Sequence, residues 1–405
     1  MKAVVFTLGC KVNETESGSI LAGLEAAGWD VSDSLEPADV YVLNTCAVTA
    51  EAEKKSRQLV ARARRYNPDA KVYVCGCASQ NSPASFEERN VAYVCGTEDK
   101  EQKVLARIAE DFGMACYSGL FPKQTRTRAF IKIQDGCNSF CSYCRIPYLR
   151  GRTWSRSIED IKRETDACTS PEIVLNGINL TAYSHEGRTL TDLILALQDV
   201  PARIRLGSLE NGIISEDFLQ ACTHLQDFAP QFHLSLQSGS TAVLKAMNRH
   251  YTREQYLERC ALVYMYFPEG SITTDIIAGF PTETDEDFAE SLSIIREAGF
   301  ARVHAFEYSQ RAGTVSARLK DLPHAVKNAR LQQLLAEGRA AEVRFVSSFA
   351  GKALDFIAED RQGQYWTGYT GNYIKIYAPG ELVPGKKYRV EIERAYEDGA
   401  IARCI

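Results

Sequence analysis

The chain has 405 residues, a length that favours two or three domains over one hydrophobic core. Hydrophobic residues make up 45% and charged residues 24%, as in a globular protein, and the net charge of −5 excludes a globally basic surface. No segment approaches the roughly 20 apolar residues that cross a bilayer, and the start lacks the apolar core of a signal peptide. We therefore expect a cytoplasmic protein with no membrane partner.

Residues 1–115 alternate short apolar runs with amphipathic segments. The apolar runs predict buried parallel strands over residues 3–6, 40–43 and 71–74. The segments 16–27 and 51–66 have helical spacing. This βαβ pattern predicts an N-terminal open parallel α/β sheet domain.

The alternation continues with new strands from residue 129, and residues 116–128 form a basic linker. Six strands are predicted, over 130–133, 172–175, 204–206, 232–236, 272–277 and 303–306. Helical segments at 158–167, 215–223 and 284–298 separate some of them. We expect a central incomplete (β/α)6 barrel over residues 129–340.

Residues 341–405 change to short strands separated by turns, after a charged helix at 325–347. The strands are predicted over 353–357, 364–369, 373–377 and 388–392. Pro-Gly pairs at 379–380 and 384–385 mark turns. A small C-terminal β-barrel fits this pattern.

The thirteen cysteines are many for a cytoplasmic protein. An odd count in a chain without a secretion signal argues against a disulfide framework. Metal or redox chemistry is the better interpretation for some of them. The others are expected to be small buried residues.

The second domain carries Cys137, Cys141 and Cys144 in a loop that follows its first strand. Three thiolates at these spacings can wrap one 4Fe–4S cluster and leave its fourth iron open for a small molecule. Zinc is the alternative, but it usually takes a fourth ligand nearby, and the following segment offers only Cys168 and His185. Core cysteines would not be expected in a loop flanked by Asp, Asn and Ser.

This motif, placed after the first strand of a β/α barrel, resembles the signature of the radical S-adenosylmethionine (SAM) superfamily. The resemblance implies that the amino and carboxylate groups of SAM chelate the open iron. It also implies that electron transfer cleaves SAM to methionine and a 5′-deoxyadenosyl radical, which abstracts hydrogen from the substrate. The protein would then supply orientation and exclude water.

Three further cysteines, Cys10, Cys46 and Cys77, each follow one strand of the first domain. Loops at the carboxyl ends of parallel strands share one edge, so these residues are expected to converge. Each alone could be a core residue, and Cys75 and Cys95 are competitors. Ahead of a radical domain, a second 4Fe–4S cluster with an open iron is the economical interpretation. We choose Cys77 because Cys75 should point into its strand.

Motifs along nearly the whole chain resemble the methylthiotransferase family. They are residues 9–13, 44–49, 76–80, 131–137, 205–210, 233–240 and 279–284, and residues 368–373 resemble the family's RNA-binding TRAM barrel. The resemblance implies insertion of sulfur at an unactivated C–H carbon and methylation of that sulfur. One SAM molecule donates the methyl group and another generates the radical. The first-domain cluster would hold the sulfur.

Three branches of the family differ in substrate. One modifies isopentenyladenosine beside the tRNA anticodon, one modifies carbon 2 of N6-threonylcarbamoyladenosine at the same place, and one modifies a ribosomal protein aspartate. Residues 9–13, 44–49 and 233–237 most resemble the threonylcarbamoyladenosine branch. The expected partners are a tRNA anticodon stem-loop, an electron donor such as a flavodoxin or ferredoxin, and an unidentified sulfur donor. The rivals are another radical reaction and a non-catalytic RNA-binding metalloprotein.

By the same resemblance, residues at or after predicted strand ends line the SAM site, where a barrel ligand is expected. They are Asn176, Gly177, Asn179, Ser208, Glu210, Gln237, Ser238, Asp275 and Gly279. Each could instead be a cap or turn residue.

Two basic segments are candidates for RNA phosphate binding. One predicted helix carries Lys54, Lys55, Arg57, Arg62, Arg64 and Arg65, and residues 121–156 carry Lys123, Arg126, Arg128, Lys132, Arg145, Arg150, Arg152 and Arg156. A solvated helix face and an ion network are the alternatives. In the last domain the aromatic residues could stack on bases or fill the core; they are Tyr365, Trp366, Tyr369, Tyr373 and Tyr377.

Overall fold

The computed structural model describes residues 1–115 and 117–405, so the first residue of the predicted linker lies outside the described part. The chain forms two compact units. The first comprises Met1–Arg126, Phe130–Asn138 and Cys144–Thr153, and the second comprises Thr127–Ala129, Ser139–Tyr143 and Trp154–Ile405. The first unit thus includes segments from both sides of the predicted linker, and the domain boundaries given above stay predictions.

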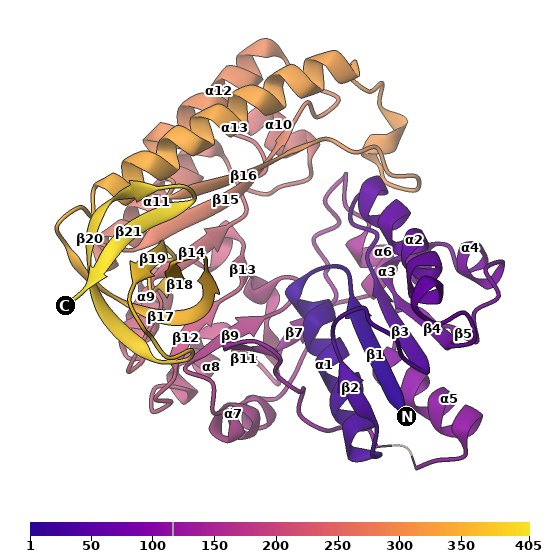
Figure 1. The fold of residues 1–405 in the computed structure, drawn as a ribbon. Coiled ribbons are helices and arrows are strands. Elements are labelled where there is room, and N and C mark those ends of the chain that lie inside the picture. Colours follow the sequence, from indigo (N-terminus) through magenta and orange to yellow (C-terminus); the bar gives the residue numbers. More distant parts are fainter. Residues whose placement is uncertain (116) are drawn as a thin grey trace. The chain divides into compact units, whose positions relative to one another are not determined.

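The first unit contains an open parallel sheet with the strand order β2-β1-β3-β4-β5 (Figure 1). The strands are β1 (Lys2–Thr7), β2 (Asp30–Ser32), β3 (Val40–Thr45), β4 (Lys71–Gly76) and β5 (Tyr93–Val94). The helices are α1 (Lys11–Ala26), α2 (Ala50–Tyr66), α3 (Cys77–Asn81), α4 (Ala84–Glu87), α5 (Lys100–Phe112) and α6 (Ile146–Arg150). The edge strands β2 and β5 were not predicted because two or three residues are too short for a periodicity signal.

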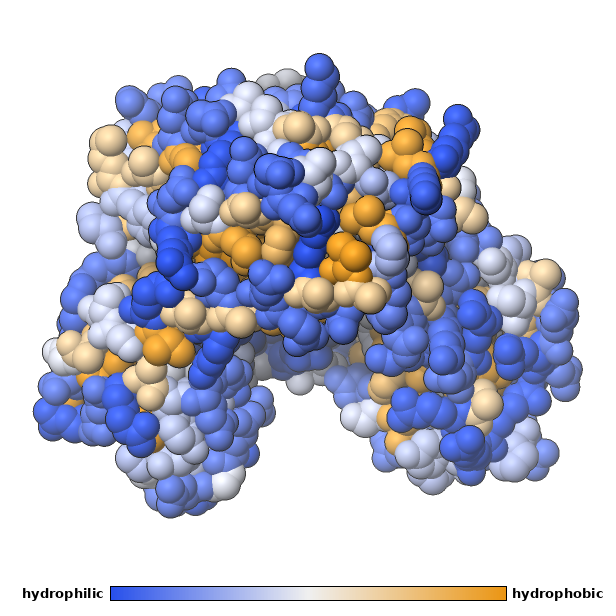
Figure 2. Space-filling view, turned by 90° about the horizontal axis from the view of Figure 1, so that it is seen from above, coloured by the Kyte–Doolittle hydropathy of each residue, from blue (hydrophilic) through white to orange (hydrophobic). Residues whose placement is uncertain are grey.

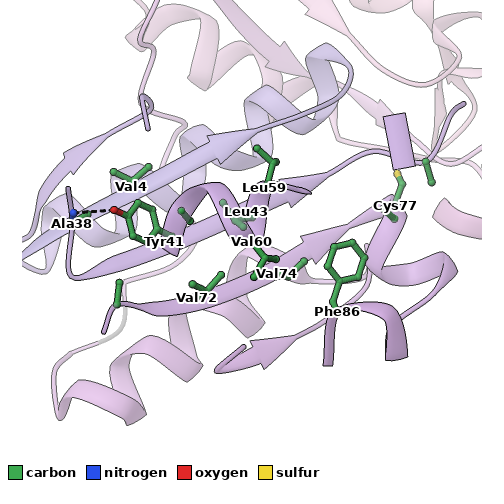
Figure 3. Packing of buried hydrophobic residues seen from close by; sticks show 14 of the residues in the cluster. Val4, Ala38, Tyr41, Leu43, Leu59, Val60, Val72, Val74, Cys77 and Phe86 are labelled. Carbon is green, nitrogen blue, oxygen red and sulfur yellow. Dashed lines mark hydrogen bonds between the residues drawn. The ribbon is translucent and has the colours of Figure 1, made fainter. Parts of the chain in front are cut away.

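Alternating side chains give this sheet a hydrophobic layer on each face. On one face Val4, Leu43 and Val74 belong to a cluster with Leu59 of α2 and Phe86 of α4 (Figure 3). On the other face the alternate strand residues pack with α1 and α5, in a cluster that includes Val5, Val42, Cys75, Ile20, Leu24, Val104 and Ile108. All six residues of β3 are buried, as expected for a central strand covered on both faces.

The six predicted strands of the central domain all form. They are β6 (Arg128–Lys132), which begins in the second unit, β9 (Glu172–Asn176), β12 (Arg203–Leu206), β14 (Gln231–Leu234), β15 (Ser271–Ala278) and β16 (Arg302–Glu307). They lie in chain order in two sheets, β6-β9-β12 and β13-β14-β15-β16, where β13 is Ser208–Leu209. A parallel bridge from Ile204 to Phe228 lies between the two sheets. The sheets do not close on each other, so the predicted incomplete barrel is confirmed.

Helices alternate with these strands. They are α7 (Ile158–Ala167), α8 (Leu190–Ala196), α9 (Glu216–Thr223), α10 (Thr241–Ala246), α11 (Arg253–Tyr266), α12 (Asp285–Glu297) and α13 (His324–Ser347). Capping boxes open α11 at Thr252 and α12 at Thr284, where the side chain of the third helical residue returns to the cap nitrogen. Four two-residue strands also occur: β7 (Gln134–Asp135), β8 (Trp154–Ser155), β10 (Ser184–His185) and β11 (Arg188–Thr189).

The C-terminal segment forms a closed barrel in the order β17-β18-β19-β21-β20, yellow in Figure 1. Its strands are β17 (Ala353–Gln362), β18 (Tyr365–Thr370), β19 (Lys375–Pro379), β20 (Lys387–Tyr396) and β21 (Gly399–Cys404). Val346, in the last turn of α13, and Phe349, just after the helix, pack into the barrel core with Val390 and Ile392. The barrel was predicted, but β21 was missed.

Some large hydrophobic side chains, such as Met265 and Val315, are exposed. The face in Figure 2 carries its hydrophobic residues in small groups among hydrophilic ones. Scattered exposure of this kind is normal for a globular surface. No described helix is both long enough and apolar enough to span a membrane.

Candidate active site

Three cysteines lie at the carboxyl ends of three neighbouring strands of the first unit. Cys10 follows β1 and is the N-cap residue of α1, Cys46 directly follows β3, and Cys77 is the first residue of α3, directly after β4. Cys10 is exposed, whereas Cys46 and Cys77 are buried. Because β1, β3 and β4 are adjacent and parallel, the structure places the three residues at one edge of the sheet, as the sequence predicts.

The turn before Cys77 depends on Gly76. Its φ of +104° lies in the region that favours glycine, and a Cβ there would lie 2.6 Å from Asn44 Oδ1 and from Thr45 O. The glycine therefore lets the chain turn from β4 into α3 beside Cys46. Cys75, one residue earlier, is fully buried in the opposite core layer with Val42, so it does not reach this edge.

The three thiols are close enough to influence one another. Burial raises the pKa of the Cys46 thiol, and the Cys77 and Cys10 thiols raise it further. Burial also raises the pKa of Cys77, while the guanidinium of Arg150 opposes that rise. A cation beside clustered thiols favours their anionic, ligating form.

A buried charge network lies beside this edge. The carboxylate of Glu16, on α1, contacts Lys100 Nζ at 2.5 Å, Lys132 Nζ at 3.0 Å and Arg150 Nη1 at 3.1 Å. The Glu16 and Lys100 side chains are at most 2% exposed. Although burial opposes its ionisation, Lys100, Lys132 and Arg150 hold the pKa of Glu16 well below its usual range.

Arg150 joins this network to the cysteine edge. Its Nη1 also lies 2.8 Å from Asp135 Oδ2, and its Nη2 donates to Asn13 Oδ1 and to Glu16 Oε2. The Nε–H of this buried guanidinium has no acceptor among the described residues. Arg150 is therefore fixed by its terminal nitrogens and retains one donor, in a position beside Cys77.

Three thiols from three neighbouring strand ends are the kind of donor set that a 4Fe–4S cluster takes. No disulfide uses any cysteine that the structure describes. No group of three or more His, Cys, Asp or Glu side chains among the described residues surrounds a single ion site. A 4Fe–4S cluster differs from such a site because each thiolate binds a different iron.

The predicted SAM-cluster cysteines occur in a segment that belongs to both units. Cys137 and Cys144 belong to the first unit and Cys141 to the second. In the first unit, the Cys144 thiol accepts a hydrogen bond from the Ile146 amide at 3.4 Å. In the second unit, Arg249 Nη1 lies 3.7 Å from Cys141 Sγ. Hydrogen bonds to sulfur tune thiolate ligands of clusters, so both contacts suit such a role.

Arg249 organises a polar group around Cys141 that the sequence did not indicate. Its Nη1 also donates to Glu210 Oε1 at 3.1 Å, and its Nη2 donates to Ser235 O at 2.7 Å. Ser139 Oγ lies 3.5 Å from both Glu210 Oε1 and Asn179 Nδ2. Two predicted SAM-site residues, Glu210 and Asn179, therefore lie in one group with Cys141.

The other predicted SAM-site residues have varied environments in the second unit. Asn176 ends β9, Gly177 follows it, and Ser208 begins β13. Gln237 and Ser238 follow β14, and Gln237 has a positive φ of 74°. Gly279 follows β15 and donates its amide to Glu283 Oε2 at 2.9 Å.

The prediction that Asp275 lies at or after a strand end is wrong. It is the fifth residue of the eight-residue strand β15. Its Oδ2 lies 3.3 Å from His233 Nε2 of β14, and it is in register with His304 of β16. The strand predicted over residues 272–277 already included this position, and the structure extends it by one residue at each end.

The basic run over residues 121–156 is an ion network and not a free basic surface. Its cations pair with carboxylates of their own unit: Lys123–Glu25, Arg126–Glu14, Arg128–Glu359, Lys132–Glu16, Lys132–Glu101, Lys132–Asp135, Arg150–Glu16, Arg150–Asp135 and Arg156–Glu164. Arg145 donates to Asn81 Oδ1 at 2.6 Å. The interpretation of these charges as a phosphate-binding patch is therefore wrong for most of the segment.

The aromatic residues of the last domain serve packing. Trp366 packs against the barrel core and Tyr377 is buried. Tyr369 and Tyr373 stack on each other with ring centroids 4.5 Å apart, and Arg128 lies 4.8 Å above the Tyr369 ring. Tyr377 is therefore a core residue, whereas Tyr365, Trp366, Tyr369 and Tyr373 are half-buried, and base stacking by these four stays a prediction.

Comparison with known proteins assigns the class. Residues 131–295 match the family described as "Radical SAM superfamily", and residues 2–96 match "Uncharacterized protein family UPF0004". The fold is similar to the radical S-adenosylmethionine methyltransferase TsrM from Kitasatospora setae, with a TM-score of 0.55 and 14% identity over 82% of this chain and 85% of that one. The protein is a radical SAM enzyme, and this class implies SAM and a 4Fe–4S cluster.

Relatives that match along their length narrow the class. The chain is 34% identical to threonylcarbamoyladenosine tRNA methylthiotransferase MtaB of Bacillus subtilis, over 100% of this chain and 97% of the relative. It is 30% identical to tRNA-2-methylthio-N(6)-dimethylallyladenosine synthase of Acetivibrio thermocellus, over 95% of this chain and 87% of the relative. The chain belongs to the radical SAM methylthiotransferase family, so the resemblance seen in its sequence is confirmed.

Proposed function

We propose that this enzyme inserts sulfur and a methyl group at carbon 2 of N6-threonylcarbamoyladenosine beside the anticodon of tRNA. The observation that carries the proposal is the 34% identity to MtaB of Bacillus subtilis over nearly the full length of both chains. MtaB proteins of Chlamydia pneumoniae and Thermotoga maritima are also 34% identical. Isopentenyladenosine tRNA is the second candidate substrate, because the dimethylallyladenosine synthases match at 30–31%.

Two clusters fit the residues of this chain. Cys137, Cys141 and Cys144 would hold the cluster that binds SAM, and the three strand-end cysteines of the first unit would hold the second; they are Cys10, Cys46 and Cys77. Together, the bound clusters and SAM would supply the radical, the sulfur and the methyl group.

The chain's own side chains orient and balance charge around these groups. Arg249 donates to Glu210 and contacts Cys141, so a cation and a carboxylate would lie beside a cluster held by Cys141. Arg150 places a second buried cation beside Cys77, which offsets part of the negative charge that three thiolates bring. The remaining partners are an electron donor such as a flavodoxin or ferredoxin and a sulfur donor, and the reaction would take place in the cytoplasm.

Mass spectrometry of tRNA nucleosides tests the substrate. In a strain that lacks this chain, we expect the methylthio group to disappear from threonylcarbamoyladenosine while threonylcarbamoyladenosine itself accumulates. The chain supplied from a plasmid should restore it. Loss of the methylthio group from isopentenyladenosine instead would identify the second candidate as the substrate. Unchanged nucleosides would contradict both candidate substrates.

A further inference from the structure

The exposed face of α2 carries a row of cations. Positions three or four residues apart share one side of a helix, and this spacing joins Lys54, Gln58, Ala61 and Arg65. Arg62 lies at the border of the same side. The opposite side, with Ser56, Leu59, Val60 and Ala63, is buried. From the sequence alone, the cations of this helix could belong either to a solvated face or to a face that binds phosphate.

This face lines a groove in the first unit. Seven residues line this open groove of about 480 Å³: Lys54, Arg57, Gln58, Ala61, Arg62, Arg65 and Arg89. The small side chain of Ala61 leaves room between the longer ones. Arg89 comes from the segment after α4 and is fixed by a hydrogen bond from its Nε to Ser85 O at 3.0 Å.

Most of the positive charge of the groove is uncompensated. Five of the seven lining residues are cations and none is acidic. Arg57 pairs with Glu53 at 3.5 Å. Lys54, Arg62 and Arg65 are exposed and make no ion pair with any residue that the structure describes. This sets α2 apart from the segment 121–156, where most cations have carboxylate partners.

Hydrogen bonds connect α2, which lines the groove, to the edge of the sheet that carries the cysteines. α2 begins after Thr49, whose Oγ1 caps the helix by accepting from the Ala52 amide. Ser56 Oγ accepts from the Cys46 amide at 3.1 Å and donates to the Cys46 carbonyl at 3.0 Å. The first turns of the helix are therefore fixed to Cys46, and the row of cations leads away from it.

We propose that this α2 groove binds the phosphate backbone of the RNA substrate. From Lys54 to Arg65 the cations cover about 16 Å of helix at ~1.5 Å per residue, enough for more than one phosphate. The lining has no aromatic side chain and one amide, so it fits sequence-independent phosphate contacts and not base readout. Ala61 is its sole apolar residue, whereas protein interfaces depend on buried apolar anchors. This inference rests on tRNA as the proposed substrate.

The test compares two double variants that remove equal charge. Arg62→Gln with Arg65→Gln alters the groove, and Lys245→Gln with Arg259→Gln alters exposed cations on α10 and α11 that pair with no carboxylate in the described part of the chain. The dissociation constant for full-length tRNA is measured between about 50 and 200 mM salt. We expect the groove variant to bind tRNA roughly tenfold or more weakly near 0.1 M salt, and to lower the log–log salt slope by about 1.4. The control variant should keep the wild-type affinity and slope.

Three outcomes separate the possibilities. Wild-type affinity and slope in the groove variant, and again in Lys54→Gln with Arg89→Gln, would overturn the proposal. A second result would also overturn it. In that case the groove variant binds tRNA as the wild type does, but methylthiolates it more slowly only when flavodoxin replaces dithionite as the reductant. This would favour an acidic protein partner. If the groove variant loses tRNA affinity but the wild-type enzyme does not modify threonylcarbamoyladenosine, the groove stands and the proposed substrate fails.

Discussion

Replacing Cys10, Cys46 and Cys77 together by alanine should abolish methylthiolation of tRNA while 5′-deoxyadenosine is still released from SAM. The reason is that these thiols lie at the ends of β1, β3 and β4, whereas the cysteines proposed to bind the SAM cluster lie at 137, 141 and 144. Removal of the first set should leave the ligands of the second unchanged. The measurement is liquid chromatography of both products after anaerobic reconstitution.

Cys75 and Cys95 provide the matched control. Cys75 is fully buried in the core layer formed with α1 and α5, and Cys95 packs against the same layer. Cys75→Ala with Cys95→Ala should keep methylthiolation, at some cost in stability. Loss of the methylthio product in this control would mean that the wrong cysteines were chosen. Loss of 5′-deoxyadenosine in the triple variant, with its SAM cluster intact, would count against separate roles.

Glu16→Gln should destabilise the first unit by about 3–5 kcal/mol, the usual loss when one partner of a buried ion pair is removed. Glu16 is the shared partner of Lys100, Lys132 and Arg150, so its loss leaves buried cations without their carboxylate. Amide hydrogen exchange in β1, β3 and β4 should accelerate by roughly two to four decades, because each 1.4 kcal/mol corresponds to about tenfold.

Glu14→Gln is the control for this variant. Glu14 lies on the same helix but pairs with Arg126, whose side chain is 64% exposed. Such a surface pair contributes about 0–1 kcal/mol, so the exchange rates should change little. Equal exchange in the Glu14 and Glu16 variants would show that the buried network does not stabilise the sheet.

The effect of Glu16 should also depend on pH. Its pKa in the folded protein lies well below its usual range because the three cations outweigh the effect of burial. A lowered folded pKa contributes stability that is complete above the unfolded pKa of about 4.3 and is lost as the pH falls toward the folded pKa. The difference between wild type and Glu16→Gln should therefore be largest near neutral pH and shrink below about pH 4.

Local patterns predicted the parts of the site that depend on strand ends. Cys10, Cys46 and Cys77 could be placed together because apolar runs identify parallel strands, and such strands end at one edge. The beginning of α1 at Lys11 was missed by five residues, since Asn13 and Glu16 are polar residues on its buried side. A polar residue among the apolar residues on the buried side of a helix was the only sequence signal for the buried charge network around Glu16.

The partners of these polar groups could not be predicted. Glu16 meets Arg150 across 134 positions of sequence, and Arg249 meets Cys141 across 108. No periodicity connects residues so far apart, because their contact depends on how complete elements pack. For the same reason the run over 121–156 looked like a basic surface until its carboxylate partners were known.

We propose that one chain binds two clusters through two separate sets of three cysteines. Iron and sulfide analysis of the anaerobically reconstituted protein, with Mössbauer spectroscopy, tests it most directly. We predict about eight irons for the wild type and about four for each triple variant, at 10, 46 and 77 or at 137, 141 and 144, since each set would hold one four-iron cluster. A wild-type protein with about four irons, or one that binds zinc at either set, would contradict the account.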